Sequence, residues 1–155
     1  MPFFSLIALT ALFQGAPELE PPLRVENAWV REAPPVADVL AAYATFCNDG
    51  AAAVTLANAS SEHFGAVQMH ATVETDSAVT MKRLDSVVIG PHECVAFEPG
   101  GWHFMLLDPK RDFRAGDEIA FTLFLASGKE MEIVMPVHRA GEMLDKQQQH
   151  QHGHH

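Results

Sequence analysis

Two side chains with metal-binding chemistry, His103 and Met105, stand two positions apart directly after the turn Pro99-Gly100-Gly101. Residues i and i+2 of a β-strand point to the same face, so an imidazole and a thioether would project side by side from one strand. Such a pair is a half-site for a soft monovalent metal ion. Alone it is a weak indication, because a histidine and a methionine also meet by chance in buried strands.

Two further residues extend the pair to a four-point pattern. Ten residues separate His70 from Met81, and twenty-one separate Met81 from His103. Two imidazoles and two thioethers are neutral ligands, and this set suits Cu(I) better than Zn(II) or Cu(II). We therefore predict a metal site made of His70, Met81, His103 and Met105. Met69 would face the other side of a regular strand, as a core residue or a reserve ligand.

The elements that must position these residues are predicted to be strands. Short apolar or alternating runs recur, separated by turn residues such as Asn48-Asp49-Gly50 and Ser127-Gly128-Lys129. Strands spaced roughly 8–12 residues apart are typical of an all-β sandwich or barrel, and no sustained helical period is present. The runs are Val25–Val30, Val39–Asn48, Ala53–Asn58, Ala66–Thr72, Ala78–Leu84, Ser86–Ile89, Cys94–Glu98, His103–Leu107, Glu118–Leu125 and Glu130–Val137.

Composition narrows the function classes. A chain of 155 residues suits one domain, and 20 acidic against 10 basic residues give a net charge of −10. Such a surface repels phosphate backbones, so we expect no DNA or other nucleic acid as a partner. The sequence has no Gly-x-Ser-x-Gly, no His-Glu-x-x-His and no phosphate-binding glycine loop. We expect a protein that is not an enzyme.

The two cysteines, Cys47 and Cys94, leave two alternatives open. They could form a disulfide in an oxidising compartment, or they could be two buried thiols. A blue-copper electron carrier, which needs a cysteine thiolate between two histidines with a weak methionine, is not favoured. Cys94 lies nine residues before His103, and the required order at short spacing is missing.

The N-terminus is predicted to direct export. Residues 2–13 are almost wholly apolar, and this run is too short to span a bilayer but typical of a signal peptide, although no Lys or Arg precedes it. We expect residues 1–16 to be a signal peptide or an N-terminal anchor. Residues 17–24 would be a linker and residues 25–138 a single folded domain.

The C-terminal segment, residues 139–155, is polar and predicted to be a flexible tail. It ends in four clustered histidines, His150, His152, His154 and His155. Clustered imidazoles chelate divalent transition metals, Cu(II) best among them, so we predict an accessory Cu(II) site in the tail. The alternative is an expression tag, although the six final residues are not a regular histidine run.

The four-point pattern is similar to the signature of the PCuAC family of periplasmic copper chaperones. That signature is a histidine, ten residues, a methionine, twenty-one residues and His-x-Met, which this chain matches without a gap. Three other segments also resemble the family. They are Val25–Val30 (VENAWV), Tyr43–Gly50 (YATFCNDG) and Glu98–Leu106 (EPGGWHFML). The likeness runs from about residue 25 to residue 137, and the two cysteines are not part of the family pattern.

The resemblance implies a cupredoxin-like Greek-key β-sandwich that binds Cu(I) in the periplasm. It also implies a metallochaperone that delivers copper to the CuA centre of cytochrome c oxidase subunit II, alongside Sco-type proteins. We expect a monomer. A periplasmic copper buffer or resistance protein is the alternative, since it would share the site and differ only in its partner.

Overall fold

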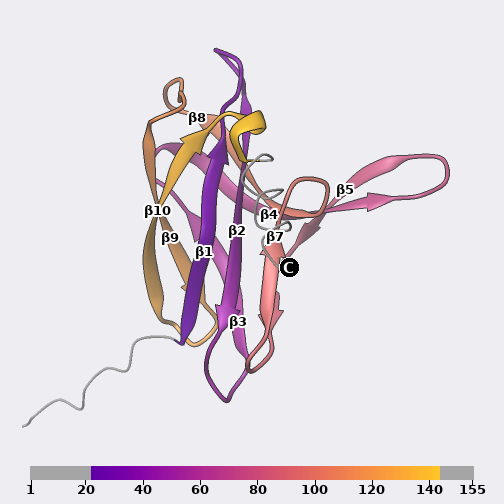
Figure 1. Cartoon of the computed structure of the whole chain (residues 1–155), viewed down its shortest axis with the longest axis vertical. Helices are drawn as coiled ribbons and strands as arrows, with labels where there is room; N and C mark the ends of the chain where they lie inside the picture. The colour runs from indigo at the N-terminus through magenta and orange to yellow at the C-terminus, as the bar shows by residue number, and fades with distance from the viewer. Residues whose placement is uncertain (1–21, 144–155) are drawn as a thin grey trace, which may run out of the picture.

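The computed structural model describes residues 22–143, which form ten β-strands and a single helical turn at residues 140–143 (Figure 1). Each predicted run corresponds to one strand, so the all-β prediction is confirmed. The strands are β1 (Leu23–Arg31), β2 (Val39–Asn48), β3 (Val54–Ser60), β4 (Phe64–Glu74), β5 (Val79–Leu84), β6 (Val87–Ile89), β7 (Cys94–Phe97), β8 (Trp102–Pro109), β9 (Glu118–Leu125) and β10 (Glu130–His138).

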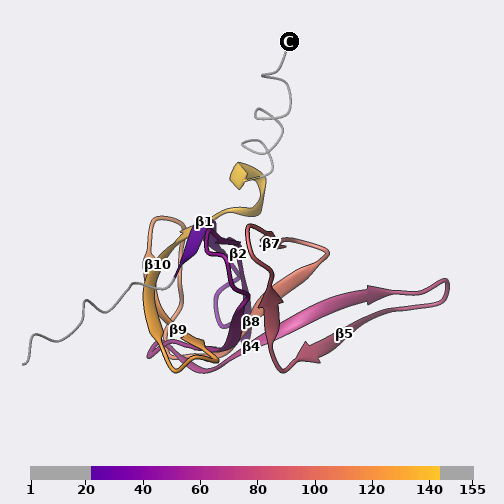
Figure 2. The same ribbon diagram turned by 90° about the horizontal axis from the view of Figure 1, so that it is seen from below.

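The ten strands form one hydrogen-bonded order, β5-β4-β8-β7-β2-β1-β10-β9-β3-β6. This order folds into two layers, β5 to β1 and β10 to β6, which the parallel pair β1–β10 joins with Val30 opposite Val137. Seen along the strands, the ribbons enclose a core between the layers (Figure 2). The predicted β-sandwich is therefore what the structure shows.

Aromatic and aliphatic side chains from both layers fill this core. In β9, buried residues alternate with exposed or half-buried ones along the whole strand, as a half-buried strand requires. The ring of Phe46 contacts those of Phe97 and Phe104 edge to face, with centroids 5.3 Å and 5.9 Å apart. Phe121 and Met135 complete the interior from the opposite layer. Burial of this apolar surface is the main force that holds the two layers together.

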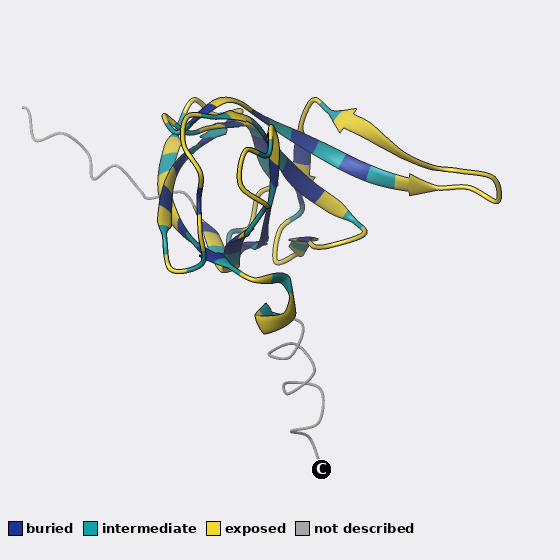
Figure 3. Ribbon diagram, turned by 90° about the horizontal axis from the view of Figure 1, so that it is seen from above, coloured by how far each residue is buried: buried dark blue, intermediate teal, exposed yellow. Residues whose placement is uncertain are grey.

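One hairpin projects from the sandwich. The pairing of β4 with β5 runs from Met69, which is opposite Leu84, to Glu74, which is opposite Val79. The ladder between β4 and β8 ends earlier on β4, at Ala71. The far half of the hairpin therefore extends beyond the two layers (Figures 2 and 3). All residues of β5 except the last are exposed. Within residues 22–143, β5 is an edge strand whose only strand partner is β4.

The two cysteines form a disulfide. Cys47 in β2 and Cys94 in β7 stand directly opposite each other, and their sulfurs are bonded at 1.99 Å. Of the two alternatives left open by the sequence, the structure has the disulfide rather than two free thiols. The bond links β2 to β7, the strand that leads through one turn into β8.

The predicted signal or anchor segment, residues 1–16, lies outside the described residues, as does most of the predicted linker. Among residues 22–143, no helix is long and apolar enough to span a membrane.

Candidate metal centre

The ladder between β4 and β8 brings together three of the four predicted ligands. His70 on β4 and His103 on β8 are a directly opposed pair, and their rings lie with centroids 5.9 Å apart and planes inclined by 31°. Directly opposed residues share a face of the sheet, and so do residues two apart in one strand. Met105 therefore lies on the same face as both histidines, opposite Gln68.

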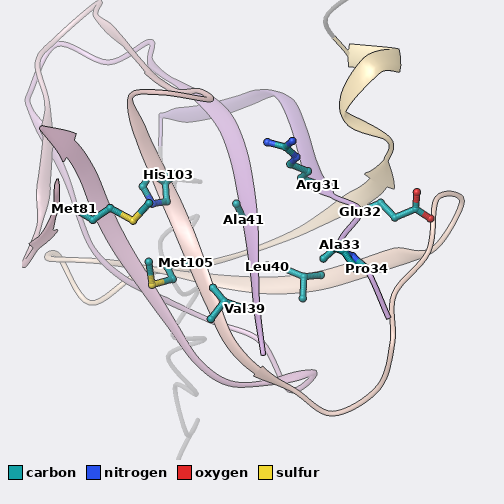
Figure 4. Close-up of a pocket in the computed structure, with 10 residues that line it drawn as sticks. All are labelled: Arg31, Glu32, Ala33, Pro34, Val39, Leu40, Ala41, Met81, His103 and Met105. Atoms are coloured by element: carbon teal, nitrogen blue, oxygen red, sulfur yellow. The ribbon is translucent and has the colours of Figure 1, made fainter. Parts of the chain in front are cut away.

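The fourth predicted ligand, Met81, comes from the hairpin. It is opposite Thr72, which is two residues beyond His70 on β4 and so on the same face. Met81, His103 and Met105 line one pocket of about 370 Å³. Figure 4 shows the Met81 thioether directed toward the His103 ring, with Met105 beside them. All four predicted side chains thus gather on one face across three adjacent strands.

The remaining wall of this pocket is mostly apolar. It is formed by Arg31 and by residues of the segment that follows β1 and the beginning of β2 (Figure 4). The other lining residues are Glu32, Ala33, Pro34, Val39, Leu40 and Ala41. An open space of this size beside the sulfurs could admit one or two side chains of another molecule.

Hydrogen bonds orient both imidazoles. Nδ1 of His103 donates to the carbonyl oxygen of Gly101 at 3.2 Å, and Nε2 of His70 donates to Oε1 of Gln68 at 3.0 Å. A neutral imidazole that donates from one nitrogen carries its lone pair on the other. Nε2 of His103 and Nδ1 of His70 are therefore the nitrogens that can bind a metal, and such orienting partners are usual behind metal-ligating histidines.

Nδ1 of His70 is the nitrogen whose surroundings fit a metal-ligating role best. This atom is buried and has no hydrogen-bond partner among the described residues. An unpaired buried polar atom costs free energy, so its presence needs a reason. A soft metal ion held by the neighbouring His103, Met81 and Met105 would supply the missing interaction.

The electrostatics of the site favour the neutral form of the His70 ring. Burial, the neighbouring His103 ring and the Arg83 guanidinium, in that order, lower the pKa of His70 below its ordinary value. The His70 ring is therefore uncharged near pH 7. A neutral ring is the form that binds metal, so protons compete weakly for this nitrogen.

The turn before β8 depends on one glycine. Gly100 has φ of +82°, in the left-handed region that side chains with a Cβ rarely adopt. The turn brings the Gly101 carbonyl within reach of His103, two residues further on. The predicted turn at residues 99–101 therefore both begins β8 and orients its first ligand.

The four ligand positions differ in exposure. His103 is 6% exposed, whereas Met81 is 57% exposed. His70 and Met105 are half-buried. The sandwich thus encloses one side of the candidate site, and the hairpin leaves the other side open.

Other residues considered in the sequence fall elsewhere. Met69 is buried in the core, as expected for the opposite face of β4. His63 packs edge to face against Phe113, and His92 is an exposed loop residue. The predicted tail ligands, His150, His152, His154 and His155, lie outside the described residues. Between residues 22 and 143, no group of three or more His, Cys, Asp or Glu side chains could hold a metal.

Several groups that surround the ligands were not predicted from the sequence. Gln68 and the Gly101 carbonyl orient the imidazoles, and Arg31 and Arg83 lie beside the site. A partial indication was available for the first two. Each precedes its histidine by two positions, which in a strand means the same face. The two arginines could not be found without the pairing of β5 with β4 and the shape of the pocket.

Comparisons with known proteins agree with this geometry. A family model described as “Putative lipoprotein LpqE-like” matches residues 23–137. The chain is 36% identical over 85 residues to an uncharacterised protein of Rickettsia prowazekii, covering 54% of this chain and 47% of that protein. It is 30% identical over 116 residues to a protein of Leifsonia xyli subsp. xyli named as a “Putative lipoprotein”, covering 74% of this chain and 69% of the relative. The chain therefore spans about half the length of the Rickettsia protein.

Solved structures show the fold. The copper-bound PCuAC domain from PmoF2 superposes with a TM-score of 0.65 at 24% identity, covering 76% of this chain and 93% of that domain. Apo-DR1885 from Deinococcus radiodurans superposes with a TM-score of 0.62 at 25% identity, covering 90% of this chain and 94% of that protein. The predicted cupredoxin-like fold, and the predicted resemblance to PCuAC domains, are confirmed.

Proposed function

The chain belongs to the LpqE-like lipoprotein family, and on that premise we propose that it is an exported copper(I)-binding metallochaperone. The proposal assigns one Cu(I) ion to His70, Met81, His103 and Met105. One observation carries it. Two neutral imidazoles and two thioethers meet on one face of three adjacent strands, and one imidazole nitrogen there is buried without a partner.

The ligand set favours Cu(I) among common metals. Thioether sulfur is a soft ligand that Mg²⁺ and Ca²⁺ avoid, and structural zinc sites are built from cysteine thiolate and imidazole. The four side chains are neutral, so a bound Cu(I) would leave the site with a single positive charge. The copper-bound PCuAC domain among the similar structures supports the same choice of metal.

A carrier suits the geometry better than a permanent copper centre. Met81 is largely exposed, and the neighbouring pocket leaves room for an incoming ligand. Such a site can pass its ion by exchanging ligands one at a time. Within this proposal the acceptor is the CuA site of cytochrome c oxidase subunit II, with Sco-type proteins as further partners. The chain acts as a monomer, and it carries copper without catalysing a reaction.

Two further parts of the proposal concern location and the tail. The lipoprotein description of the family and the Cys47–Cys94 disulfide both support an exported protein in the periplasm, because disulfides persist mainly in oxidising compartments. The four tail histidines would hold Cu(II) as an accessory site. The tail is not needed for the Cu(I) site.

An anaerobic competition titration with a chromophoric Cu(I) chelator tests the central site. We expect a colourless complex with one tightly bound Cu(I), lost in the His103→Ala, Met105→Ala double variant. His92→Ala, which removes an exposed imidazole elsewhere, serves as the matched control. Unchanged high-affinity binding in the double variant would falsify the assignment.

A transfer experiment separates the chaperone from a copper buffer. Cu(I)-loaded protein is mixed anaerobically with reduced apo cytochrome c oxidase subunit II. Samples taken at intervals are oxidised by one electron per dinuclear centre with hexacyanoferrate(III), because only the mixed-valence centre has the visible spectrum that reports its assembly. A chaperone loads the acceptor faster than the same amount of free chelated copper does. A buffer or resistance protein retains its ion and gives no acceleration.

A further inference from the structure

Two guanidinium groups flank the candidate copper site. Arg83 on β5 stands directly opposite His70, so its side chain leaves the sheet on the same face as the ligands. Arg31, the last residue of β1, lines the pocket together with Met81 and His103 (Figure 4). In the described part of the chain, neither arginine takes part in an ion pair with a carboxylate.

The carboxylates nearby do not offset these charges at the site. Glu32 is the one acidic residue that lines the pocket. Its oxygens are engaged on the far side, by the backbone N–H of Ala115 at 3.0 Å and by Arg139 at 3.5 Å. Glu74 shares the ligand face of β4, two residues beyond Thr72, the partner of Met81, and Asp85 follows the end of β5. Neither carboxylate is among the groups that shift the pKa of His70, whereas Arg83 is.

The positive charges beside the site contrast with the net charge of the whole molecule. The chain carries a net charge of −10, which attracts metal cations of every kind to its surface. Directly opposite His70, by contrast, the fixed charge is the positive charge of Arg83. Fixed positive charges weaken the binding of any cation, so their position beside a cation site calls for an explanation.

The explanation lies in how this repulsion depends on ionic charge. The Coulomb energy between a guanidinium and a bound ion is proportional to the charge of the ion, so a divalent ion loses twice the binding free energy that a monovalent ion loses. Imidazole pairs bind Cu(II) and Zn(II) well, so the two histidines alone would not exclude divalent ions. The thioethers favour a soft ion, and a neighbouring guanidinium adds a repulsion that grows with the charge of the ion.

We propose that Arg83, assisted by Arg31, is a specificity-determining residue that favours monovalent copper over divalent ions at this site. The inference rests on the proposed Cu(I) function and deepens it, by naming what excludes competing metals. Neither guanidinium is a ligand. Both act through space, and because both are exposed their effect is screened and modest.

The test compares Cu(I) and Zn(II) binding in full-length wild type and variants. Side-chain NMR signals of the His70 and His103 rings report occupancy of this site separately from the tail histidines. Cu(I) is titrated anaerobically against a chelator and Zn(II) is titrated directly. Both measurements are made at pH 8, well above the ordinary pKa of an imidazole, so that protonation does not contribute.

Arg83→Gln should raise the Cu(I) affinity about threefold and the Zn(II) affinity about tenfold, the second change being about the square of the first. In the Arg31→Gln, Arg83→Gln double variant, both affinities should rise further, and the change for Zn(II) should again be about the square of the change for Cu(I). Arg83→Lys keeps the charge and should leave both affinities near wild type. Arg24→Gln removes the same charge at the other end of β1 and should change neither.

Three results would overturn the proposal. The first two are equal changes in the Cu(I) and Zn(II) affinities, and no change in either affinity. The third is that Zn(II) does not bind even to the double variant, which would show that the ligands alone set the selectivity. Failure of the proposed function looks different. In that case the His70 and His103 signals of the wild type do not respond to Cu(I) at all.

Discussion

Strands β8 and β5 both contribute to the candidate site, but they differ in their position in the sheet and in the exposure of the ligand that each carries. β8 lies inside the sheet order, pairs with β4, β7 and β2, and carries His103 at 6% exposure. β5 is an edge strand on a projecting hairpin and carries Met81 at 57% exposure. The sandwich therefore fixes one part of a coordination sphere before any metal arrives, and the hairpin supplies the part most easily exchanged.

This division explains how one small site could both hold and release an ion. Ligands that are buried and hydrogen-bonded lose little freedom when they bind, so they contribute most to affinity. An exposed thioether on an edge strand is ordered at a greater entropic cost and can be replaced by an incoming ligand. The proposal therefore predicts unequal effects of removing ligands from the two strands.

The largest effect should come from His103. We expect His103→Ala to lower Cu(I) affinity more than a hundredfold, because it removes a preorganised ligand and leaves the His70 nitrogen without its neighbour. Competition with a Cu(I) chelator measures the change. Thermal unfolding of the apo protein checks that the sandwich is intact. A loss of Cu(I) affinity of less than threefold in a folded variant would show that β8 does not provide the preorganised part of the coordination sphere.

A smaller loss of affinity and a faster release should follow from Met81→Ala. We expect about a thirtyfold loss of Cu(I) affinity, since a soft ligand is removed but the three others stay in place. Stopped-flow transfer of Cu(I) to a chelator should be faster than from wild type. Val79→Ala, an equally exposed change on the same strand, is the control. If Met81→Ala costs as much as His103→Ala, the distinction between the two strands is lost.

Much of this fold followed from the sequence. The period-2 alternation and the turn residues located all ten strands. They could do so because alternate residues of a half-buried strand face the core and the solvent, which leaves a period of two in the sequence. The His103–Met105 spacing also predicted a shared face, since i and i+2 in a strand leave no other choice. The identity of the ligands remains a prediction, although the four side chains lie on one face of three adjacent strands.

The long-range pairings could not be predicted in the same way. Nothing local shows that Arg83 stands opposite His70, or that Cys47 stands opposite Cys94, because cross-strand register depends on the packing of the whole sheet. The exposure of Met81 has the same origin. Its strand mixes apolar residues with Lys82 and Arg83, so its composition does not settle its burial. The β4–β8 ladder ends at Ala71 and leaves the far half of the hairpin outside the sandwich.

The hydrogen bond between Gln68 and His70 helps to fix the orientation of one ligand on the sandwich side of the site. Gln68→Leu removes the acceptor for Nε2 of His70, and we expect about a tenfold loss of Cu(I) affinity, within the range typical of such partners. Gln68→Glu restores an acceptor oxygen and should recover most of the loss. ¹⁵N chemical shifts of the His70 ring should show a changed tautomer balance in the leucine variant only. An unchanged balance in both variants would assign Gln68 a purely structural role.

The smallest effect on copper should come from the disulfide, although its effect on stability is large. A bond between residues separated by 47 positions restricts the unfolded chain, so the Cys47→Ser, Cys94→Ser variant should lose about 3–4 kcal/mol of unfolding free energy. Denaturant unfolding measures this loss. The bond joins β2 to β7 and does not touch β5 or the ligand-bearing part of β8, so Cu(I) affinity of the folded variant should stay within about twofold. A larger loss would mean that the turn before His103 depends on the disulfide, and that the fixed half of the site is held by the bond as well as by the sheet.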